Sequence, residues 1–197
     1  FSHFRHHHFR VVEVKSIVKK MATPLEIALD ALQARKTILY PTDTVWGIGC
    51  DATDKKAVAK IFQIKQREES KSLIVLVDSL DMLLTHVAVP EKALQIIKKS
   101  TRPTTIIYPN PIGLAANVLA ADNTVAIRIV QDDFCAQLIT KFGKPIVSTS
   151  ANISGEMTPK SFKEIGPAIL ESVDYIVNLH REKITHKSST ILKIEND

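Results

Sequence analysis

The amino-acid sequence predicts a single α/β domain in which helices flank an open, twisted sheet. Its 197 residues fall within the size range of one domain. Short apolar runs that are typical of buried strands alternate with stretches of helical periodicity, and neither repeats nor long linkers interrupt them. Apolar residues make up 45% of the chain, which is enough for a core and excludes a disordered protein.

The domain proper opens near Ala22 with a helix start. Thr23 can cap the helix, Pro24 needs no backbone N–H at the first helical position, and Glu26 can complete a capping box. Apolar residues then recur on one helix face, at Leu25, Ala28, Leu29 and Leu32.

The remaining elements follow from the same two periodicities. Helical spacing predicts helices at residues 54–66, 79–85, 90–99 and 132–142, and one that starts at 158–159 and ends before 166–167. Apolar runs predict strands at residues 37–40, 73–77, 104–108, 124–130, 145–148, 174–179 and 190–194. Residues 110–122 are the longest irregular stretch, where we expect a loop or a lid over a site.

Residues 1–20 differ from the rest of the chain. Histidines crowd into the first eight residues, with phenylalanines and basic residues between them. Such a tract can bind metal, and the alternative is a terminal extension without a site role. We interpret residues 1–20 as an extension of the second kind, in which residues 11–14 could form an edge strand.

The net charge and the cysteines of the sequence limit the possible classes of protein. The formal net charge of +5 suits an anionic partner such as a nucleotide or RNA. Cys50 and Cys135 are far apart and form no CxxC motif, so we expect two reduced thiols in a cytoplasmic protein. No apolar stretch is long enough to cross a bilayer, and we expect no membrane association.

Three polar clusters follow predicted strands or helices. The first, Pro41 to Gly47, places two threonines and Asp43 directly after a strand, either as site groups or as a turn that satisfies its own backbone. The second is Lys65-Gln66-Arg67 with the later Lys71, which suits phosphate or carboxylate but also the negative end of a helix.

The third cluster, Ser148 to Gly155, leaves the strand predicted at 145–148. Its hydroxyl and amide groups suit nucleotide or phosphate recognition, and the alternative is a polar loop with a helix cap. No histidine lies in any of the three clusters, so no nucleophilic triad is evident. The sequence also contains neither a Walker P-loop nor a GxGxxG fingerprint, so ATP binding would need a less common framework.

Five segments, in this order and spacing, resemble the YrdC-like threonylcarbamoyl-adenylate synthase family in its short form, without the extra C-terminal domain of some members. They are PTDTVWGIGCDA at 41–52, KQR with a later lysine at 65–71, TVAIR at 124–128, GKPIVSTSANISG at 143–155 and SST at 188–190. The resemblance covers about residues 22–194, so we expect residues 21–197 to form one YrdC-like domain with a deep basic cavity.

The resemblance implies an activity and its partners. The expected reaction forms threonylcarbamoyl-AMP and pyrophosphate from L-threonine, bicarbonate and ATP, for the t6A modification of tRNA. Mg²⁺ is expected with ATP, with no metal ligand among the protein side chains. Further partners that the family suggests are tRNA or double-stranded RNA and the downstream threonylcarbamoyl-transferase proteins.

The resemblance also assigns residues by position. The ATP-binding residues would be Arg67, Lys71, Thr124, Ser150, Asn152 and Thr158. The threonine-binding residues would be Thr44, Arg128, Ser148 and Ser189. Lys65 and Arg67 would act electrostatically, with no general base assigned, because phosphoryl transfer needs fixed cations and donors rather than a protein nucleophile. Residues from all three clusters are expected to converge on one pocket.

Two other functions remain open from the sequence. The same basic cavity would serve a non-catalytic YrdC-like protein that binds RNA or nucleotides. It would also serve an accessory domain for carbamoyl transfer, because the family's fold occurs in a hydrogenase-maturation factor. Pyrophosphate release that requires both threonine and bicarbonate separates the synthase from the other two.

Overall fold

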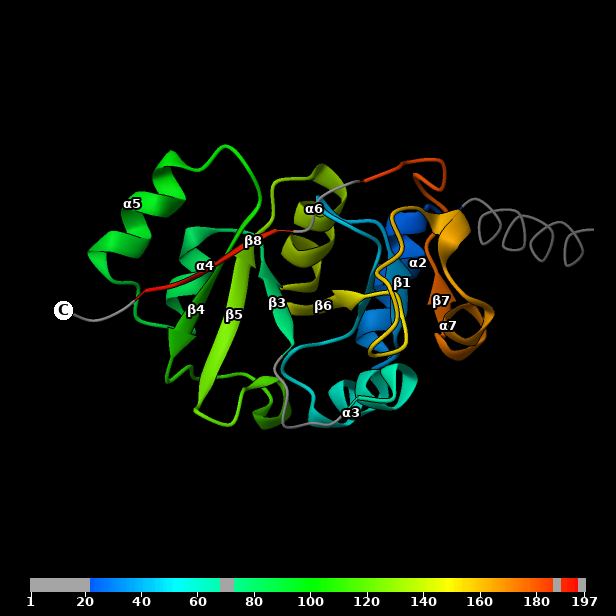
Figure 1. The fold of residues 1–197 in the computed structure, drawn as a ribbon, viewed down its shortest axis with the longest axis horizontal. Helices are drawn as coiled ribbons and strands as arrows, with labels where there is room; N and C mark the ends of the chain where they lie inside the picture. The colour runs from blue at the N-terminus through cyan, green and yellow to red at the C-terminus, as the bar shows by residue number, and fades with distance from the viewer. Residues whose placement is uncertain (1–21, 68–72, 186–188, 195–197) are drawn as a thin grey trace, which may run out of the picture.

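A computed structural model describes residues 22–67, 73–185 and 189–194. In these residues one open, mixed sheet has the strand order β7-β1-β2-β6-β3-β5-β4-β8 (Figure 1). The strands are β1 (Ile38–Tyr40), β2 (Gly47–Gly49), β3 (Ile74–Val77), β4 (Thr104–Pro109), β5 (Thr124–Ile129), β6 (Ile146–Ser150), β7 (Tyr175–Ile176) and β8 (Thr190–Lys193). The predicted α/β class with an open, twisted sheet is therefore confirmed.

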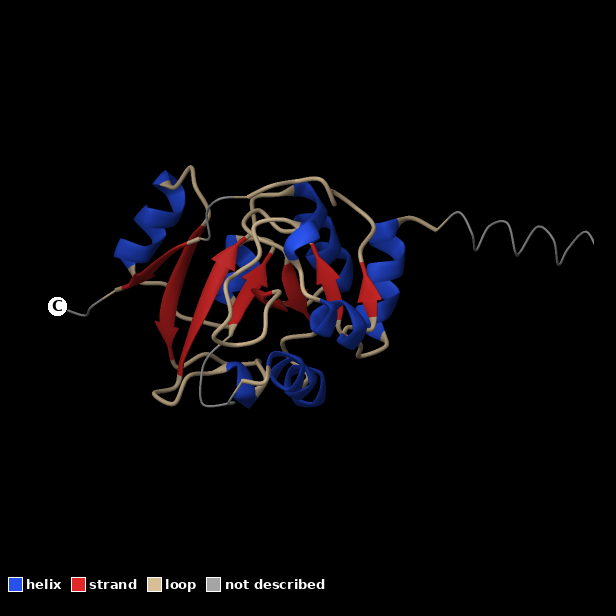
Figure 2. Cartoon of the chain, turned by 45° about the vertical axis from the view of Figure 1, so that its right-hand side comes forward, coloured by secondary structure: helices blue, strands red, loops and turns tan. Residues whose placement is uncertain are grey.

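Helices lie on both faces of this sheet (Figure 2). They are α2 (Pro24–Gln33), α3 (Lys55–Lys65), α4 (Leu80–Leu84), α5 (Glu91–Lys99), α6 (Asp133–Phe142) and α7 (Pro167–Ser172), with short 3₁₀ turns η1 (Ala116–Val118) and η2 (Phe162–Glu164). Helices α2 and α6 pack together over one face, whereas α3, α4, α5, α7 and η1 contribute to the core on the other. No helix in the described ranges is long and apolar enough to span a bilayer.

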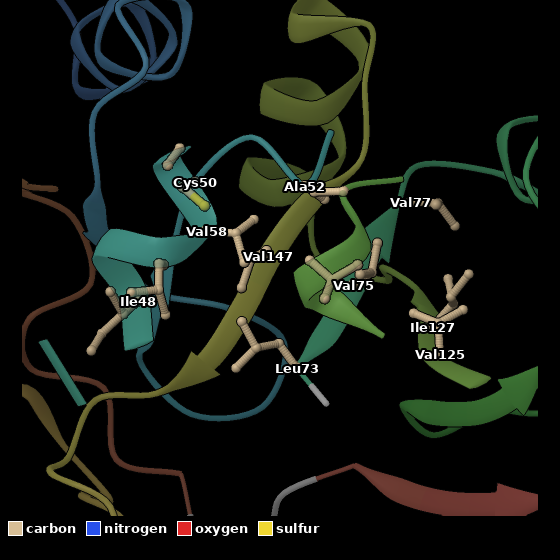
Figure 3. Close-up of a cluster of buried hydrophobic side chains, with 14 of the residues drawn as sticks. Ile48, Cys50, Ala52, Val58, Leu73, Val75, Val77, Val125, Ile127 and Val147 are labelled. Atoms are coloured by element: carbon tan, nitrogen blue, oxygen red, sulfur yellow. The ribbon is translucent and has the colours of Figure 1, made fainter. Parts of the chain in front are cut away.

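The larger core fills the sheet face under α3 (Figure 3). Alternate strand residues reach it, because successive side chains of a strand point to opposite faces. They include Ile48, Val75, Val77, Val125, Ile127 and Val147, all 2% exposed or less. The other face carries the remaining residues of the same strands, and this second face holds the polar side chains discussed below.

Helix starts follow the capping signals in the sequence. Thr23 caps α2 by accepting a hydrogen bond from the backbone N–H of Glu26, with Pro24 at the first position. Asp54, Ser79 and Asp132 cap α3, α4 and α6 in the same way. These caps explain why the predicted starts of four helices agree with the structure to within one residue.

The prediction of a helix from 158–159 to before 166–167 is wrong. Residues 160–161 instead pair with residues 184–185, through a bridge between Ser161 and Ile184 and a hydrogen bond from the N–H of Thr185 to Lys160 O. This extended pairing leaves room only for the turn η2. The helix begins later, at Pro167 of α7, where proline again occupies a first helical position.

Strand β2 was not among the predicted elements, and β6 runs two residues beyond its predicted end. Strand β2 is Gly-Ile-Gly, and glycine is unfavourable in strands. The neighbouring Tyr40 explains Gly49, because its ring lies across β2 and its hydroxyl donates to Val147 O at 2.9 Å. A Cβ at position 49 would lie 2.5 Å from both the Tyr40 ring and Val147 O.

Replacing this glycine should therefore destabilise the sheet. We expect Gly49→Ala to lower the free energy of unfolding by about 2–3 kcal/mol, the scale of an overpacked core. Urea denaturation measures the change. Gly166→Ala is the control, because a Cβ there meets nothing within 4 Å, and its cost as a helix cap should stay below about 1 kcal/mol. Equal losses in the two variants would contradict the steric explanation.

Candidate active site

The register of the sheet places polar residues of several strands on its second face. Arg128 of β5 lies opposite Thr105 of β4, and Ser148 of β6 lies opposite Ile74 of β3. Ser150, at the end of β6, lies opposite Gly47 of β2. Two groups of side chains form on this framework, one around Lys65 and one around Arg128.

Lys65 is the last residue of α3, and its side chain is 1% exposed. Its ammonium Nζ donates to the backbone carbonyl of Ser150 at 2.6 Å and to that of Asn152 at 3.0 Å, and it lies 3.4 Å from Ser150 Oγ. Burial, together with the smaller effect of the positive charge of Arg67, lowers the pKa of Lys65 to about 8. A cation is thus fixed at the carboxyl end of the central strand.

Asn152 shapes the loop that leaves this strand. Its side-chain Nδ2 donates to the carbonyls of Ile153 and Glu156, both at 3.0 Å. Its Oδ1 is buried and has no hydrogen-bond partner among the described residues. The loop therefore presents Ser150 and Asn152 in a fixed geometry next to Lys65.

Arg128 forms the second group and is 2% exposed. Its Nη2 donates to Asp43 Oδ1 at 3.0 Å and to Thr44 Oγ1 at 3.3 Å. Thr44 is held in turn by Thr42, whose Oγ1 lies 3.1 Å from Thr44 Oγ1 and accepts from the Thr44 N–H at 3.0 Å. The predicted threonine-binding residues Thr44 and Arg128 are therefore in direct contact.

Two serines extend this group along the same face. Ser189 precedes the edge strand β8, and its hydroxyl is hydrogen-bonded at 2.7 Å to that of Thr105, the register partner of Arg128. Ser148 is 8% exposed, and its Oγ lies 2.7 Å from the place that a Cβ of residue 47 would occupy. Glycine at position 47 therefore gives the Ser148 hydroxyl its space.

The other predicted residues are more dispersed. Arg67 follows α3 and is half-buried, and burial lowers the pKa of its guanidinium. Thr124 begins β5, where its hydroxyl donates to Asp122 at 2.6 Å, and Thr158 is exposed. Lys71 lies outside the described residues. One pocket that gathers all of these residues stays a prediction.

The structure also gives contacts to two residues that were absent from the predicted ATP- and threonine-binding sets. Asp43 pairs with Arg128, and Thr105 connects Ser189 to the same strand. The sequence did contain a signal for Thr105. It alternates with the apolar Ile106 and Tyr108, so its side chain points to the opposite face of the sheet. The signal for Asp43 was its position between two threonines after a strand, which a simple turn explains equally well.

These groups have a common chemistry. Lys65 and Arg128 are buried cations, and hydroxyl groups of Ser150 and Thr44 lie beside them. Fixed cations with neighbouring donors stabilise bound phosphate or carboxylate groups. Both groups are therefore suited to anionic ligands.

The depressed pKa of Lys65 has a consequence for stability. Between about pH 8 and 10.5 the unfolded chain binds a proton at Lys65 that the folded protein has released. Stability therefore rises with pH in this window, relative to a variant without the amine, by up to about 3 kcal/mol. Chemical denaturation of the wild type and Lys65→Met across this range measures the difference.

A second lysine on the same helix provides the control. Lys60 is exposed, so Lys60→Met should keep the pH dependence of the wild-type protein. Parallel stability curves for the wild type and Lys65→Met would contradict a strongly shifted pKa at Lys65.

Comparison with known proteins identifies relatives of the whole domain. The family model of Sua5, YciO and YrdC proteins, described as telomere recombination, matches residues 30–197. The chain is 34% identical over 155 residues to the threonylcarbamoyl-AMP synthase of Pseudoalteromonas translucida, covering 77% of this chain and 83% of that protein. It is 35% identical over 163 residues to a putative threonylcarbamoyl-AMP synthase of Methanocaldococcus jannaschii, covering 82% and 76%.

A solved structure agrees with these relatives. Sua5 of P. abyssi, crystallised with L-threonine, superimposes with a TM-score of 0.79 and 28% identity over 86% of this chain. The alignment covers 50% of the Sua5 chain, so the present chain spans half the length of that protein. Because the family model covers most of the chain and the fold agrees, the chain belongs to the Sua5/YciO/YrdC family.

Proposed function

We propose that this protein is an L-threonylcarbamoyladenylate synthase, which forms threonylcarbamoyl-AMP and pyrophosphate from L-threonine, bicarbonate and ATP. The observation that carries the proposal is the pair of buried cations, Lys65 and Arg128. Lys65, at the end of α3, contacts the end of β6, and Arg128 belongs to β5, which is separated from β6 by β3. Relatives at 34% and 35% identity bear the name of this enzyme or of a putative one, and a Sua5 structure contains L-threonine.

Two separate cations suit the phosphates of one substrate and the carboxylate of another. Lys65 and Arg67, with Ser150 and Asn152, would bind the phosphates of ATP. Arg128 would bind the carboxylate of threonine. The remaining proposed contacts are Lys71, Thr124 and Thr158 for ATP and Thr44, Ser148 and Ser189 for threonine.

Strand β6 gives these two groups a useful separation. Ser148 and Ser150 are two residues apart on the same face, which corresponds to about 7 Å along a strand. This is about the length of one amino acid. A threonine held near Ser148 would therefore extend towards a nucleotide held near Ser150.

The chemistry requires charge stabilisation more than a nucleophile. The amine of threonine combines with bicarbonate to give a carbamate and water. A carbamate oxygen then attacks the α-phosphorus of ATP, and pyrophosphate leaves with the electrons of the broken P–O bond. Lys65 and Arg67 would stabilise the charge on the phosphoryl oxygens during this step. Mg²⁺, bound to the phosphates of ATP, would neutralise further charge.

Partners beyond the substrates follow from the product. We expect the adenylate to be consumed by a threonylcarbamoyl-transferase that acts on tRNA, in the cytoplasm. The net charge of +5 favours contact with tRNA or double-stranded RNA. The names of the relatives favour the synthase over a non-catalytic binding protein.

The reaction can be tested directly with the purified protein. Pyrophosphate release from ATP should require L-threonine and bicarbonate together, and omission of either should reduce it to the background rate. Release that is independent of threonine, or no release with all three substrates and Mg²⁺ present, would exclude the synthase. Nucleotide binding without release would then favour the non-catalytic alternative.

Arg67 should matter for catalysis and little for stability. We expect Arg67→Ala to cost about 2–4 kcal/mol of transition-state stabilisation, the scale of one lost preorganised donor. Lysine keeps the charge but not the planar fork, so Arg67→Lys should restore only part of the activity. Pyrophosphate release and thermal unfolding are measured on the same samples.

Arg35 provides a matched control for this experiment. Its side chain is 60% exposed and pairs with Asp54 at 2.6 Å, away from both groups of the candidate site. Arg35→Ala should therefore leave turnover unchanged. Wild-type kinetics in Arg67→Ala would remove this residue from the site, and a loss of stability alone would assign it to the end of α3.

A further inference from the structure

Asp43 is bound both to β5 and to the backbone just beyond the end of that strand. Its side chain is 6% exposed. One carboxylate oxygen, Oδ1, accepts from Arg128 Nη2 at 3.0 Å, and the other, Oδ2, accepts from the backbone N–H of Gln131 at 3.2 Å. Gln131 follows the end of β5, three residues after Arg128. The carboxylate thus spans from the side chain of Arg128 to the backbone just beyond the strand that carries this arginine.

The same contacts fix the segment that contains Asp43. Thr42 Oγ1 donates to Val45 O at 2.7 Å and accepts from the N–H of Thr44 at 3.0 Å. Arg128 Nη2 contacts both Asp43 and Thr44, so one guanidinium nitrogen joins the segment to β5. A change at Asp43 therefore reaches Arg128 and Thr44 together.

The guanidinium keeps unused hydrogen-bonding capacity. Arginine has five N–H donors in a planar arrangement, and the direction of the plane decides where the remaining donors point. Arg128 Nε is buried and has no partner among the described residues. Because Arg128 is almost fully buried, its charge needs a fixed counter-charge, which Asp43 supplies.

We propose that Asp43 is a positioning residue for the amino-acid half of the site, which sets the orientation of Arg128 and holds Thr44 against it. This inference rests on the proposed function. Asp43 touches the arginine rather than the reacting atoms, so its removal should weaken recognition of the threonine carboxylate. Binding of ATP, which involves the group around Lys65, should change little.

The decisive variant is Asp43→Asn, which keeps the size of the side chain but removes its charge and one acceptor. At saturating ATP and bicarbonate, the KM for L-threonine should rise by about 10- to 100-fold, the scale of a misplaced binding group. The KM for ATP should stay within about twofold of the wild-type value. Unchanged KM values for both substrates, or equal changes in both, would overturn the proposal.

Asp54→Asn is a matched control. Asp54 also pairs with an arginine, Arg35, and also accepts a backbone N–H, from Lys56 at 3.1 Å, but it lies outside the candidate site. This variant should lose thermal stability and keep the wild-type KM for threonine. If the KM for threonine rises as much in Asp54→Asn as in Asp43→Asn, the effect at Asp43 is explained by a general loss of stability.

A ligand comparison tests whether Asp43 acts through the arginine. Thermal unfolding is followed with L-threonine and with L-threoninamide, which lacks the carboxylate. L-threonine should stabilise the wild type more than the amide does, and this preference should shrink in Asp43→Asn while stabilisation by ATP persists. If the preference is undiminished in a folded Asp43→Asn protein, Asp43 does not position Arg128.

Two further outcomes are distinguishable. If Asp43→Asn does not fold, Asp43→Glu retains the charge but displaces the carboxylate by one methylene, and it should show the same selective rise in the KM for threonine. A folded Asp43→Glu protein with wild-type kinetics would then overturn the proposal. If the wild type itself neither releases pyrophosphate nor is stabilised by L-threonine, the proposed function fails rather than the role of Asp43.

Discussion

The backbone carbonyls at the carboxyl end of β6 lie in the interior of the protein, where an oxygen without a donor costs about 1–3 kcal/mol. Lys65 provides the donors, because its ammonium contacts the carbonyls of both Ser150 and Asn152. The contact is reciprocal, since the backbone N–H of Ser154 donates to the carbonyl of Lys65 at 2.8 Å. The turn after the central strand is thereby wrapped around the last residue of α3, which holds Ser150 and Asn152 in place.

The same strands form both faces of the sheet, but the two faces have different roles. On one face β-branched and other apolar residues build the larger core, which supplies most of the stability. The second face carries buried Arg128 and Thr105, and burying such groups is tolerated only when each is hydrogen-bonded. Alternation along the strands therefore places Arg128, Thr105 and Ser148 on one face without interrupting the core on the other.

Much of this arrangement could be predicted from local patterns. Apolar runs located most strands, and side-chain caps such as Thr23 and Asp54 located helix starts, because both signals depend on neighbouring residues. Strand β2 could not be found in this way, since its glycines are explained by the ring of Tyr40, which lies across it. The pairing of residues 160–161 with 184–185 is likewise a tertiary contact that overrides a local helix signal.

The candidate site was predictable in its residue types but not in its pairings. Basic and hydroxyl residues after strands indicated anionic ligands, which stays a prediction. The structure brings two of these residues, Thr44 and Arg128, into contact. The two hydrogen bonds of Asp43 join residues 85 and 88 positions apart in the chain. No local periodicity encodes such a distance, so the role of Asp43 appears only when the strands are assembled.

The edge strand β8 bears on the order in which the molecule can be completed during synthesis. It pairs in parallel with β4, and the hydroxyl of Ser189 bonds to that of Thr105, which is fully buried and lies 84 residues earlier. During synthesis on the ribosome, β4 therefore emerges long before β8. Until β8 is made, the Thr105 hydroxyl lacks its partner Ser189 and one edge of β4 is unpaired. Such an edge attracts other strands, so a nascent chain stalled before residue 189 would be more prone to aggregation than the finished protein.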